Sequence, residues 1–490
     1  MSAREREALE GARVVVAGLG TSGIAAARVL HAVGAHVLAV DADPAALDAA
    51  ELPPGVERLA LGDREALAEA ALDGARGRPD VLVASPGLRP DLPLLHRAVQ
   101  VGVPCWSEVE LAWRVQAASP TRLPWLTLTG TNGKTTTVGM LSSILSAAGL
   151  RAPAVGNVGT AISTVALEGG ADVLAVELSS FQLHLTHTVA PRASACLNIS
   201  ADHIDWHGSY EAYWAAKAKV FARTERACVY SVADPATREM VEQADVQDGA
   251  RAIGTTLGTP GVAELGVVDD VLVDRAFLPQ RQTHALPLAT AEDLLHLTGS
   301  GRREDLPPHV VADALAAAAL ARAHGVEPGA VAQGLRDFQP GAHRIQLVAV
   351  HDGVSYVDDS KATNAHAASA SLAAVPAGRA VWVAGGLAKG ARFEELVAER
   401  ADRLHAAVLI GVDRAPLREA LARHAPEVPV VEVSADDTGD VMTHAVRAAA
   451  RLARPGDTVL LAPACASMDQ FRSYAERGDA FARAARALEH

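Results

Sequence analysis

The sequence has 490 residues, of which 49% are hydrophobic and 21% charged, and its formal net charge is −14. This length and composition predict a globular chain of several domains and exclude an intrinsically disordered one. The excess of acidic residues argues against a general binder of nucleic acid or of anionic membranes, because such a protein needs a basic surface.

Cysteine usage and apolar patterning indicate the compartment. The chain contains Cys105, Cys196, Cys228 and Cys465, which are scattered and form no C-x-x-C pair. This pattern fits a reducing compartment and offers no zinc site. The first ten residues are charged, and no apolar run has the length of a membrane span. We therefore expect a cytoplasmic protein without a secretory signal or a membrane anchor.

The first predicted unit is a strand, a glycine turn and a helix. Residues 13–17 form the predicted strand, Gly18-Leu19-Gly20-Thr21-Ser22-Gly23 the turn, and the next strand, 36–40, ends at Asp41. This G-x-G-x-x-G pattern with a following acidic residue is the dinucleotide fingerprint, which alone predicts a nicotinamide enzyme. The same geometry binds other nucleotide diphosphates. A further strand, 81–84, leads into the sharp turn Ser85-Pro86-Gly87.

A second strand, loop and helix follow a proline-containing linker at 117–124. The apolar run at 125–128 predicts a buried strand. A glycine loop follows, Gly130-Thr131-Asn132-Gly133-Lys134-Thr135-Thr136, and from Val138 apolar residues recur at helical spacing. Such a loop directs backbone N–H groups and a helix N-terminus at phosphate oxygens. We predict ATP, with Lys134 at the terminal phosphates and the hydroxyl of Thr135 or Thr136 in a Mg²⁺ shell.

That prediction leaves one alternative open. The full G-x-x-x-x-G-K-[ST] motif requires an earlier glycine, and Leu128 occupies its position. The shorter G-x-x-G-K-T pattern is less specific, so a plain glycine turn between a strand and a helix is the alternative interpretation.

Two ionisable residues downstream are candidates for the same site. A strand at 173–176 ends at Glu177, at the sheet edge where open α/β folds place ligands. We predict that Glu177 binds Mg²⁺, and helix capping is the alternative. His203 lies in a loop with a second histidine and two aspartates, but the spacing is not that of a zinc site.

Lysine is scarce in this chain and therefore informative. Only five of the 44 basic residues are lysines, namely Lys134, Lys217, Lys219, Lys361 and Lys389. Lys217 falls on the apolar face of a helix predicted from Ser209, whereas Lys219 is expected to face solvent. Burial favours the neutral amine, which predicts a chemical role for Lys217; a lysine that extends to the rim of the core is the alternative.

The last part of the chain predicts a new α/β alternation. Strands are expected near 354–357, 380–384, 407–410, 430–433 and 458–461. Three of them run into unusual segments, at 359–364, 385–390 and 462–471, in which small residues gather, with a lysine in each of the first two and glycines in the second. Three such loops at strand ends predict an anion-binding rim. An alanine-rich helix at 307–325 precedes this part.

Seven motifs occur in a fixed order. They are G-T-N-G-K-T-T, E-L-S-S-F-Q-L, N-I-S-A-D-H-I-D, A-A-K, H-R, D-D-S-K-A-T-N and A-P-A-C-A-S-M-D-Q-F-R-S-Y-A-E-R-G. Together they resemble the Mur ligases, the ATP-dependent amino-acid ligases of peptidoglycan synthesis, over essentially the whole chain. The first five are shared among muramyl and folyl ligases, and the last two point to the member that adds D-glutamate.

The resemblance implies an α/β fold of three domains. Residues 1–118 would form a Rossmann-like domain that binds UDP, residues 119–340 a central ATPase domain of P-loop type, and residues 341–490 a Rossmann-like domain that binds the amino acid. The first glycine loop would then hold uridine diphosphate, which replaces the nicotinamide interpretation. A monomer that acts on small molecules, and not on nucleic acid or membranes, is implied.

The implied activity is the ligation of D-glutamate to UDP-N-acetylmuramoyl-L-alanine. ATP would phosphorylate the free carboxylate of the alanyl group, giving an acyl phosphate and ADP, and the amine of D-glutamate would then displace phosphate. Because two anions meet in the first step, charge neutralisation should dominate catalysis.

The resemblance also implies roles for individual residues. The UDP-linked substrate is expected against Leu19, Gly20, Thr21, Ser22, Asp41, Ser85, Pro86, Gly87 and Asn157. ATP is expected against Gly130, Thr131, Asn132, Gly133, Lys134, Thr135, Thr136, Arg344 and Asp359. One Mg²⁺ would lie at Glu177 with Thr135 or Thr136, and a second at His203 with Lys217 as an N-carboxylated lysine. Catalysis is assigned to Lys134, His203 and Lys217, and D-glutamate binding to Lys361, Thr363, Lys389, Ser467, Met468 and Tyr474.

Some positions depart from the family pattern. Asp313 stands where an asparagine near adenine is usual, Tyr474 stands where phenylalanine is common, and P-G-A-H-R differs from the usual approach to H-R. Two alternatives therefore remain: another ligase of the superfamily that adds a different amino acid, and a non-catalytic nucleotide-binding protein.

Overall fold

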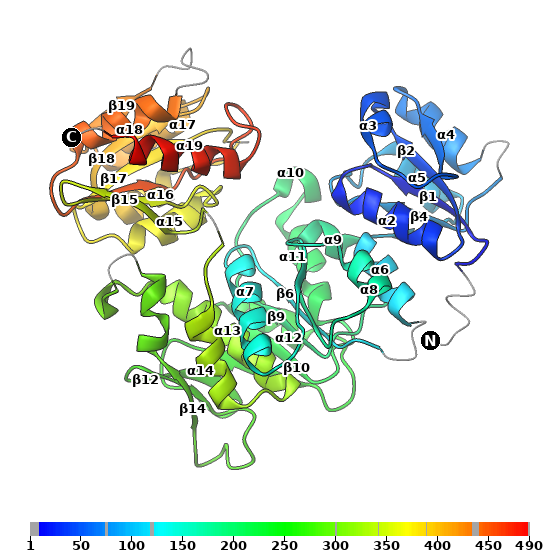
Figure 1. The fold of residues 1–490 in the computed structure, drawn as a ribbon, viewed down its shortest axis with the longest axis horizontal. Coiled ribbons are helices and arrows are strands. Elements are labelled where there is room, and N and C mark those ends of the chain that lie inside the picture. Colours follow the sequence, from blue (N-terminus) through cyan, green and yellow to red (C-terminus); the bar gives the residue numbers. More distant parts are fainter. Residues whose placement is uncertain are drawn as a thin grey trace. The chain divides into compact units, whose positions relative to one another are not determined.

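The computed structural model describes residues 9–73, 77–117, 122–298, 301–341, 343–388, 390–433 and 441–488. The chain forms two compact units, Met1–Thr290 with Ala312–Phe338, and Ala291–Val311 with Gln339–His490. The first unit contains two β-sheets and the second contains one (Figure 1). The three sheets lie in the three parts of the chain that were expected to form domains, and the exact domain boundaries remain predictions.

The N-terminal sheet is parallel and has the strand order β3-β2-β1-β4-β5. Its strands are β1 (Arg13–Ala17), β2 (His36–Asp41), β3 (Glu57–Ala60), β4 (Val81–Ala84) and β5 (Cys105–Trp106). Its helices are α2 (Thr21–Ala32), α3 (Pro44–Ala49), α4 (Arg64–Leu72), α5 (Pro93–Gln100) and α6 (Glu108–Ala117). The apolar runs of β1 and β4 are fully buried, as expected for parallel strands covered by helices on both faces.

The central sheet has nine strands in the order β14-β13-β12-β11-β10-β9-β6-β8-β7. They are β6 (Trp125–Thr129), β7 (Ala154–Gly156), β8 (Leu174–Glu177), β9 (Ala193–Cys196), β10 (Ala227–Ser231), β11 (Arg251–Thr255), β12 (Glu264–Val268), β13 (Val271–Asp274) and β14 (Leu286–Thr290). The strands from β7 to β12 are parallel, and the last three form an antiparallel edge. Strand β6 lies between β8 and β9, although the chain leaves it toward β7, so a crevice is expected at its carboxyl end.

Helices cover both faces of the central sheet (Figure 1). They are α7 (Lys134–Ala147), α8 (Ile162–Glu168), α9 (Ser180–His184), α10 (Ile204–His207), α11 (Tyr210–Ala218), α12 (Pro235–Glu242), α13 (Pro308–His324) and α14 (Pro328–Asp337), with the 3₁₀ turn η1 (Lys219–Phe221). Two further 3₁₀ turns, η2 (Ala291–Leu297) and η3 (Arg303–Asp305), belong to the second unit. The predicted linker at 117–124 begins on the last residue of α6, and its residues 118–121 lie outside the described part of the chain.

The C-terminal sheet has the order β15-β16-β20-β17-β18-β19, and only β15 is antiparallel. The strands are β15 (Gln346–His351), β16 (Val354–Asp358), β17 (Ala380–Gly385), β18 (Leu404–Ile410), β19 (Val430–Glu432) and β20 (Thr458–Leu461). The helices are α15 (Ala365–Ala373), α16 (Glu394–Arg400), α17 (Ala415–His424), α18 (Val441–Leu452) and α19 (Tyr474–Arg486), with the 3₁₀ turn η4 (Ala401–Arg403). All five predicted strands of this part are confirmed.

A buried carboxylate on α6 ties the N-terminal part of the chain to the central sheet. Glu110 Oε2 accepts hydrogen bonds from the backbone N–H of His187 (2.8 Å) and Thr188 (2.9 Å), and Oε1 accepts one from Arg114 Nε at 2.8 Å. Burial alone would raise the pKa of the Glu110 carboxyl, but the hydrogen bonds from Thr188 and His187 and the charge of Arg114 lower it.

We expect Glu110→Ala to lower the free energy of unfolding by about 3 kcal/mol, because it leaves two backbone N–H groups and the partly buried guanidinium of Arg114 without their acceptor. A carboxyl with a lowered pKa stabilises the fold above its unfolded pKa, so the difference from wild type should shrink as the pH falls below about 4. Urea unfolding of both proteins, at neutral pH and again below about pH 4, measures this difference in unfolding free energy. Glu69→Ala, at an exposed site on α4, is the matched control. Equal midpoints for the two variants would contradict the expectation.

Candidate active site

The glycine loop after β6 is held in shape by the segment that follows β9. The backbone N–H of Thr131 donates to Asn198 O at 3.0 Å, and that of Asn132 donates to Asn198 Oδ1 at 2.9 Å. Gly133 has φ 81°, and a Cβ there would lie 2.3 Å from Asp313 Oδ1, so only glycine fits. The loop and the N-terminus of α7 thus share the crevice beside β6.

Two lysine ammonium groups share one carbonyl oxygen of this loop. Lys134 Nζ donates to Gly130 O at 2.9 Å and to Thr131 O at 2.7 Å, and Lys217 Nζ donates to Gly130 O at 2.7 Å. Lys217 is only 2% exposed. Burial, with a further contribution from the charge of Lys134, lowers the pKa of Lys217 to about 7. The predicted burial of Lys217 on its helix is confirmed, and its neutral form is readily accessible near neutral pH.

The predicted solvent exposure of Lys219 is wrong. Lys219 is half-buried, and its Nζ donates to His184 O at 2.5 Å. The physical reason is local: α11 ends at Ala218 and the chain tightens into the 3₁₀ turn η1. The tighter turn changes the direction of each following side chain from the α-helical one.

Glu177 lies at the carboxyl end of β8 with two polar partners. Its Oε2 accepts from Thr135 Oγ1 at 2.7 Å, and its Oε1 accepts from Asn157 Nδ2 at 2.8 Å. The carboxylate is buried and therefore fixed in position. Of the two candidate threonines, the structure places Thr135 against Glu177. A buried carboxylate beside a hydroxyl at a helix N-terminus is an oxygen-donor set that suits Mg²⁺.

In the part of the chain that the structure describes, no three His, Cys, Asp or Glu side chains gather as a metal cage. A Mg²⁺ ion at Glu177 would therefore take most of its ligands from water and from phosphate oxygens, as Mg²⁺ commonly does.

His203 lies on the other side of the glycine loop, among aromatic rings. It caps α10 with φ 53°, and its ring packs on Phe181 at 4.7 Å between centroids. Burial, together with the charges of Lys134 and Lys217, lowers the pKa of His203, while Asp202 opposes the shift. The His203 ring lies 6.5 Å from that of Tyr213, whose hydroxyl group shares a 2.9 Å hydrogen bond with Thr131 Oγ1 of the glycine loop.

The first glycine loop brings together the ends of three N-terminal strands. Leu19 N donates to Asp41 Oδ2 at 3.0 Å, and Ser85 N donates to Ala17 O at 2.9 Å. Thr21 and Ser22 form the first turn of α2, which Gly20 precedes. The turn Ser85-Pro86-Gly87 closes where Leu88 N donates to Ser85 O at 3.0 Å. Asn157 lies instead beside Glu177, in the central sheet.

The second unit gathers the C-terminal candidates around a buried arginine. Arg477, with no exposed surface, donates from Nε to Ser360 Oγ (3.0 Å) and from Nη1 to Cys465 O (3.1 Å). Ser360 Oγ in turn donates to Tyr474 O at 2.7 Å, and Lys361 Nζ lies 3.8 Å from the centroid of the Tyr474 ring. Burial lowers the pKa of Arg477 to about 10.

The other C-terminal candidates are placed as follows. Asp359 is buried and accepts a hydrogen bond from Ser371 Oγ; burial raises its pKa to about 6, although Ser371 and Arg344 oppose the shift. Thr363 N donates to Lys361 O at 2.8 Å. Ser467 is buried, Met468 is 72% exposed, and Lys389 lies outside the described residues.

The chain matches three family models. Residues 12–107 match the Mur ligase MurD-like N-terminal domain, residues 128–261 the Mur ligase middle domain, and residues 343–465 the Mur ligase glutamate ligase domain. The UDP-N-acetylmuramoylalanine–D-glutamate ligase of Streptomyces coelicolor is 56% identical over 98% of this chain and 98% of that protein. The chain belongs to the Mur ligase family.

Other relatives and solved structures agree with this assignment. Proteins with the same name from Thermobifida fusca and Mycobacterium tuberculosis are 52% and 47% identical, and each alignment covers 98% of this chain, with 99% and 96% of the relatives. MurF from Acinetobacter baumannii is similar in fold, with a TM-score of 0.53 over 94% of both chains at 15% identity. Mur ligases use ATP and Mg²⁺, and the oxygen donors at Glu177 fit that requirement.

Several contributors to this Mur ligase site were not predicted from the sequence. Tyr213, on the helix predicted from Ser209, shares a 2.9 Å hydrogen bond with Thr131 Oγ1. Asn198 supports the glycine loop, and its place directly after a strand was the available signal. Phe181 packs against His203, and Arg477 organises the C-terminal loops. Both residues stand inside motifs named above, E-L-S-S-F-Q-L and the last of the seven, but no individual role was predicted for either.

Proposed function

We propose that this Mur ligase joins D-glutamate to UDP-N-acetylmuramoyl-L-alanine in an ATP-dependent, ADP-forming reaction of peptidoglycan precursor synthesis. The relatives that are named for this reaction align with 98% of the chain, which supports the substrates. The observation that carries the chemistry is the convergence of Lys134 and Lys217 on Gly130 O, beside the pair of Thr135 and Glu177.

The first chemical step requires that two anions approach each other. An oxygen of the alanyl carboxylate attacks the γ-phosphorus of ATP, the bond to the β–γ bridging oxygen breaks, and ADP leaves. Lys134 supplies a positive charge that can turn from the loop carbonyls to the phosphates, and the N–H groups at the start of α7 bind phosphate oxygens. These groups lower the repulsion most strongly in the transition state.

The second step forms the amide. The neutral amine of D-glutamate attacks the acyl-phosphate carbonyl, the amine loses a proton, and inorganic phosphate leaves with one oxygen of the former carboxylate. We assign D-glutamate to Lys361, Thr363, Lys389, Ser467, Met468 and Tyr474. The contact of Lys361 Nζ with the Tyr474 ring supports a preformed cationic wall for its carboxylates.

We assign one Mg²⁺ to Thr135 and Glu177 and a second to His203 and Lys217. When bound, these ions offset phosphate charge. For the second site we propose that the neutral Lys217 amine adds to CO₂: an N–C bond forms, a proton is released, and the product is an anionic carbamate. The low pKa of Lys217 supports this step, because the reaction needs the neutral amine.

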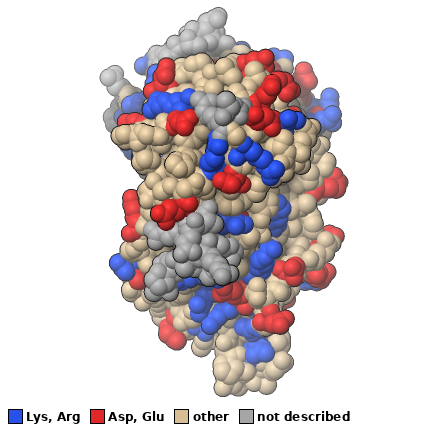
Figure 2. Space-filling model, turned by 90° about the vertical axis from the view of Figure 1, so that its right-hand side faces the viewer, with Lys and Arg blue, Asp and Glu red and all other residues tan. Residues whose placement is uncertain are grey.

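The remaining assignments follow the same pattern. Leu19, Gly20, Thr21, Ser22, Asp41, Ser85, Pro86 and Gly87 would bind the uridine diphosphate, and Asn157 the muramoyl part. Arg344 would bind a phosphate and Asp359 the ATP ribose. We further propose a cytoplasmic monomer that binds neither membranes nor nucleic acid. No helix in the described ranges is long and apolar enough to cross a membrane, and Figure 2 shows acidic and basic side chains intermixed on the face in view.

A phosphate-release assay over a panel of amino acids tests the proposal. With ATP, Mg²⁺ and UDP-N-acetylmuramoyl-L-alanine present, we expect release that depends on D-glutamate and is absent with L-glutamate, L-alanine or meso-diaminopimelate. Turnover with one of these and not with D-glutamate would assign the chain to another ligase of the family. No turnover with any amino acid would favour a non-catalytic nucleotide-binding protein.

A further inference from the structure

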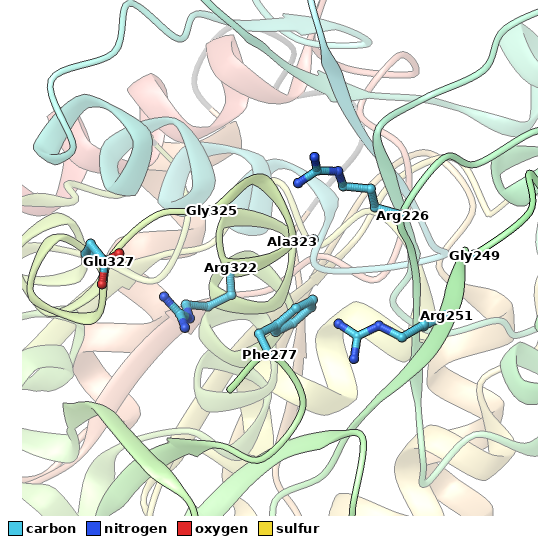
Figure 3. A pocket seen from close by; sticks show the side chains of 8 residues that line it. All are labelled: Arg226, Gly249, Arg251, Phe277, Arg322, Ala323, Gly325 and Glu327. Carbon is cyan, nitrogen blue, oxygen red and sulfur yellow. The ribbon is translucent and has the colours of Figure 1, made fainter. Parts of the chain in front are cut away.

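A second basic pocket lies in the central part of the chain, separate from the glycine loop. It encloses about 370 Å³ and is lined by Arg226, Arg251 and Arg322, with Phe277 between them and Glu327 at one side (Figure 3). This volume is that of a small-molecule site. Three guanidinium groups around one cavity stand out in a chain whose net charge is −14.

The pocket lies at the opposite edge of the sheet from the ATP loop. Arg192 directly precedes β9, Arg226 directly precedes β10, and Arg251 begins β11. Their backbones form a row, in which Arg226 N donates to Arg192 O and Arg251 N donates to Arg226 O, each at 2.9 Å. These strands are parallel to β6, whose carboxyl end leads into the loop with Lys134. The two sites therefore share no residue.

The arginines of the pocket are only partly compensated. Arg322 Nε pairs with Asp274 Oδ2 at 3.0 Å and its Nη1 donates to Val326 O. Arg251 donates to a backbone carbonyl, and its guanidinium carbon lies 5.2 Å from the Phe277 ring centroid. Among the described residues, the Arg226 guanidinium has no hydrogen-bond or ion-pair partner. Because this side chain is exposed at the pocket, its five N–H donors are free to exchange water for the oxygens of a polyvalent anion.

Neighbouring groups add to the positive potential. Arg192 and Arg226 occupy registered positions on adjacent strands, where like charges repel. Burial, and next the charge of Arg226, lowers the pKa of Arg192, while Glu225 opposes the shift. Burial also lowers the pKa of His324, and the charges of both arginines add to that shift. Within the described residues, Arg192 Nε and His324 Nδ1 are buried without a hydrogen-bond partner. A fold that places this repulsion beside a cavity gains stability when an anion enters.

We propose that this pocket binds a small anion that carries a diphosphate group, at a site independent of the ATP loop. Arg226 and Arg251 bind the phosphoryl oxygens, and Arg322, held by Asp274, offers its second terminal nitrogen. The planar guanidinium matches phosphate geometry in a way that lysine does not. Free pyrophosphate and a nucleoside diphosphate share this chemistry.

Calorimetric titration of the full chain with pyrophosphate, and separately with ADP, tests the proposal. Both titrations use Lys134→Ala as the background, which removes the anchor of the ATP site, and include saturating UDP-N-acetylmuramoyl-L-alanine, which fills the proposed uridine diphosphate site. We expect one pyrophosphate per chain, with affinity lowered roughly tenfold for each of Arg226→Gln and Arg251→Gln. Arg238→Gln, at an exposed arginine of α12 in the same domain, should leave the affinity unchanged.

The outcomes are distinct. Equal losses for pyrophosphate and ADP assign the pocket to the diphosphate group, and a loss confined to pyrophosphate assigns it to the inorganic ion. Pyrophosphate affinity that survives both substitutions, or falls equally with Arg238→Gln, overturns the proposal, as does the absence of binding. Arg226 is exposed and Arg251 is partly buried, so Arg226→Gln is the variant that should leave the fold intact. If Arg251→Gln unfolds, the result for Arg226→Gln alone decides the test.

Discussion

Lys217→Ala is expected to lower the rate of D-glutamate-dependent phosphate release by about 10³-fold or more. The substitution removes the only buried amine that shares Gly130 O with Lys134 in the described part of the central sheet, and with it the proposed carbamate. Added bicarbonate should not restore activity, because no amine remains to react. Full activity of the variant would refute the role of Lys217.

Lys219→Ala is the matched control for this experiment. Lys219 is two residues away and is half-buried, whereas Lys217 is fully buried, and its ammonium group donates to His184 O and not to the glycine loop. We expect a change in rate of no more than a few fold. Carbon NMR of wild-type protein with labelled bicarbonate should show a carbamate signal that Lys217→Ala lacks and Lys219→Ala retains. The signal should grow as the pH rises through about 7, the pKa of the Lys217 amine.

Lys134→Ala is the second variant with a large expected effect. We expect kcat/KM for ATP to fall by about 10³-fold or more, because the charge nearest the transferred phosphoryl group is lost. Lys134→Arg should restore little, since the ammonium fits between Gly130 O and Thr131 O at 2.9 Å and 2.7 Å and a planar guanidinium does not have that shape.

The outcome that contradicts this role is specific. If Lys134→Ala retained wild-type kcat/KM while a Glu177→Gln variant lost activity, the metal site would carry the phosphate charge without the lysine. The glycine loop would then be a structural turn, which is the alternative that the missing first glycine at Leu128 left open.

Local patterns were sufficient to predict much of the fold. The apolar runs at β1, β4, β6 and β20, and the glycine-containing turns after the first three, were predicted at their observed places, because buried parallel strands have continuous apolar sequences. Glu177 was predicted at a strand end for the same reason. The helix from Ser209 was predicted by its cap, and Ser209 Oγ accepts from Ala212 N at 3.1 Å.

Other elements depend on contacts that one sequence does not display. Strand β9 reads Ala-Ser-Ala-Cys, which has no β-branched residue, and it forms only because it lies between β6 and β10. Strand β15 contains the apolar run Leu347 to Val350, yet it is an antiparallel edge strand in which no residue is buried, so its place in the sheet does not follow from that run. Arg477 lies in a charged helix segment, so its burial depends on the distant Ser360 and Cys465.

The direction of the Lys219 side chain also depends on contacts that the sequence does not display, here within a single helical turn. The helical period predicted where it should point, but the change from α11 to η1 was decided by packing of Val220 and Phe221 into the core. The helical period predicts side-chain directions only within a helix, and the position of a helix end is itself defined only to within about one or two residues.

The central claim is that grouped cations and a metal site make a carboxylate reactive by phosphorylating it. Labelling both alanyl carboxyl oxygens of UDP-N-acetylmuramoyl-L-alanine with a heavy isotope, and analysing the phosphate by mass spectrometry, tests this directly. The account predicts that every phosphate released during ligation carries one labelled oxygen. Phosphate without label, formed together with the amide product, would contradict it.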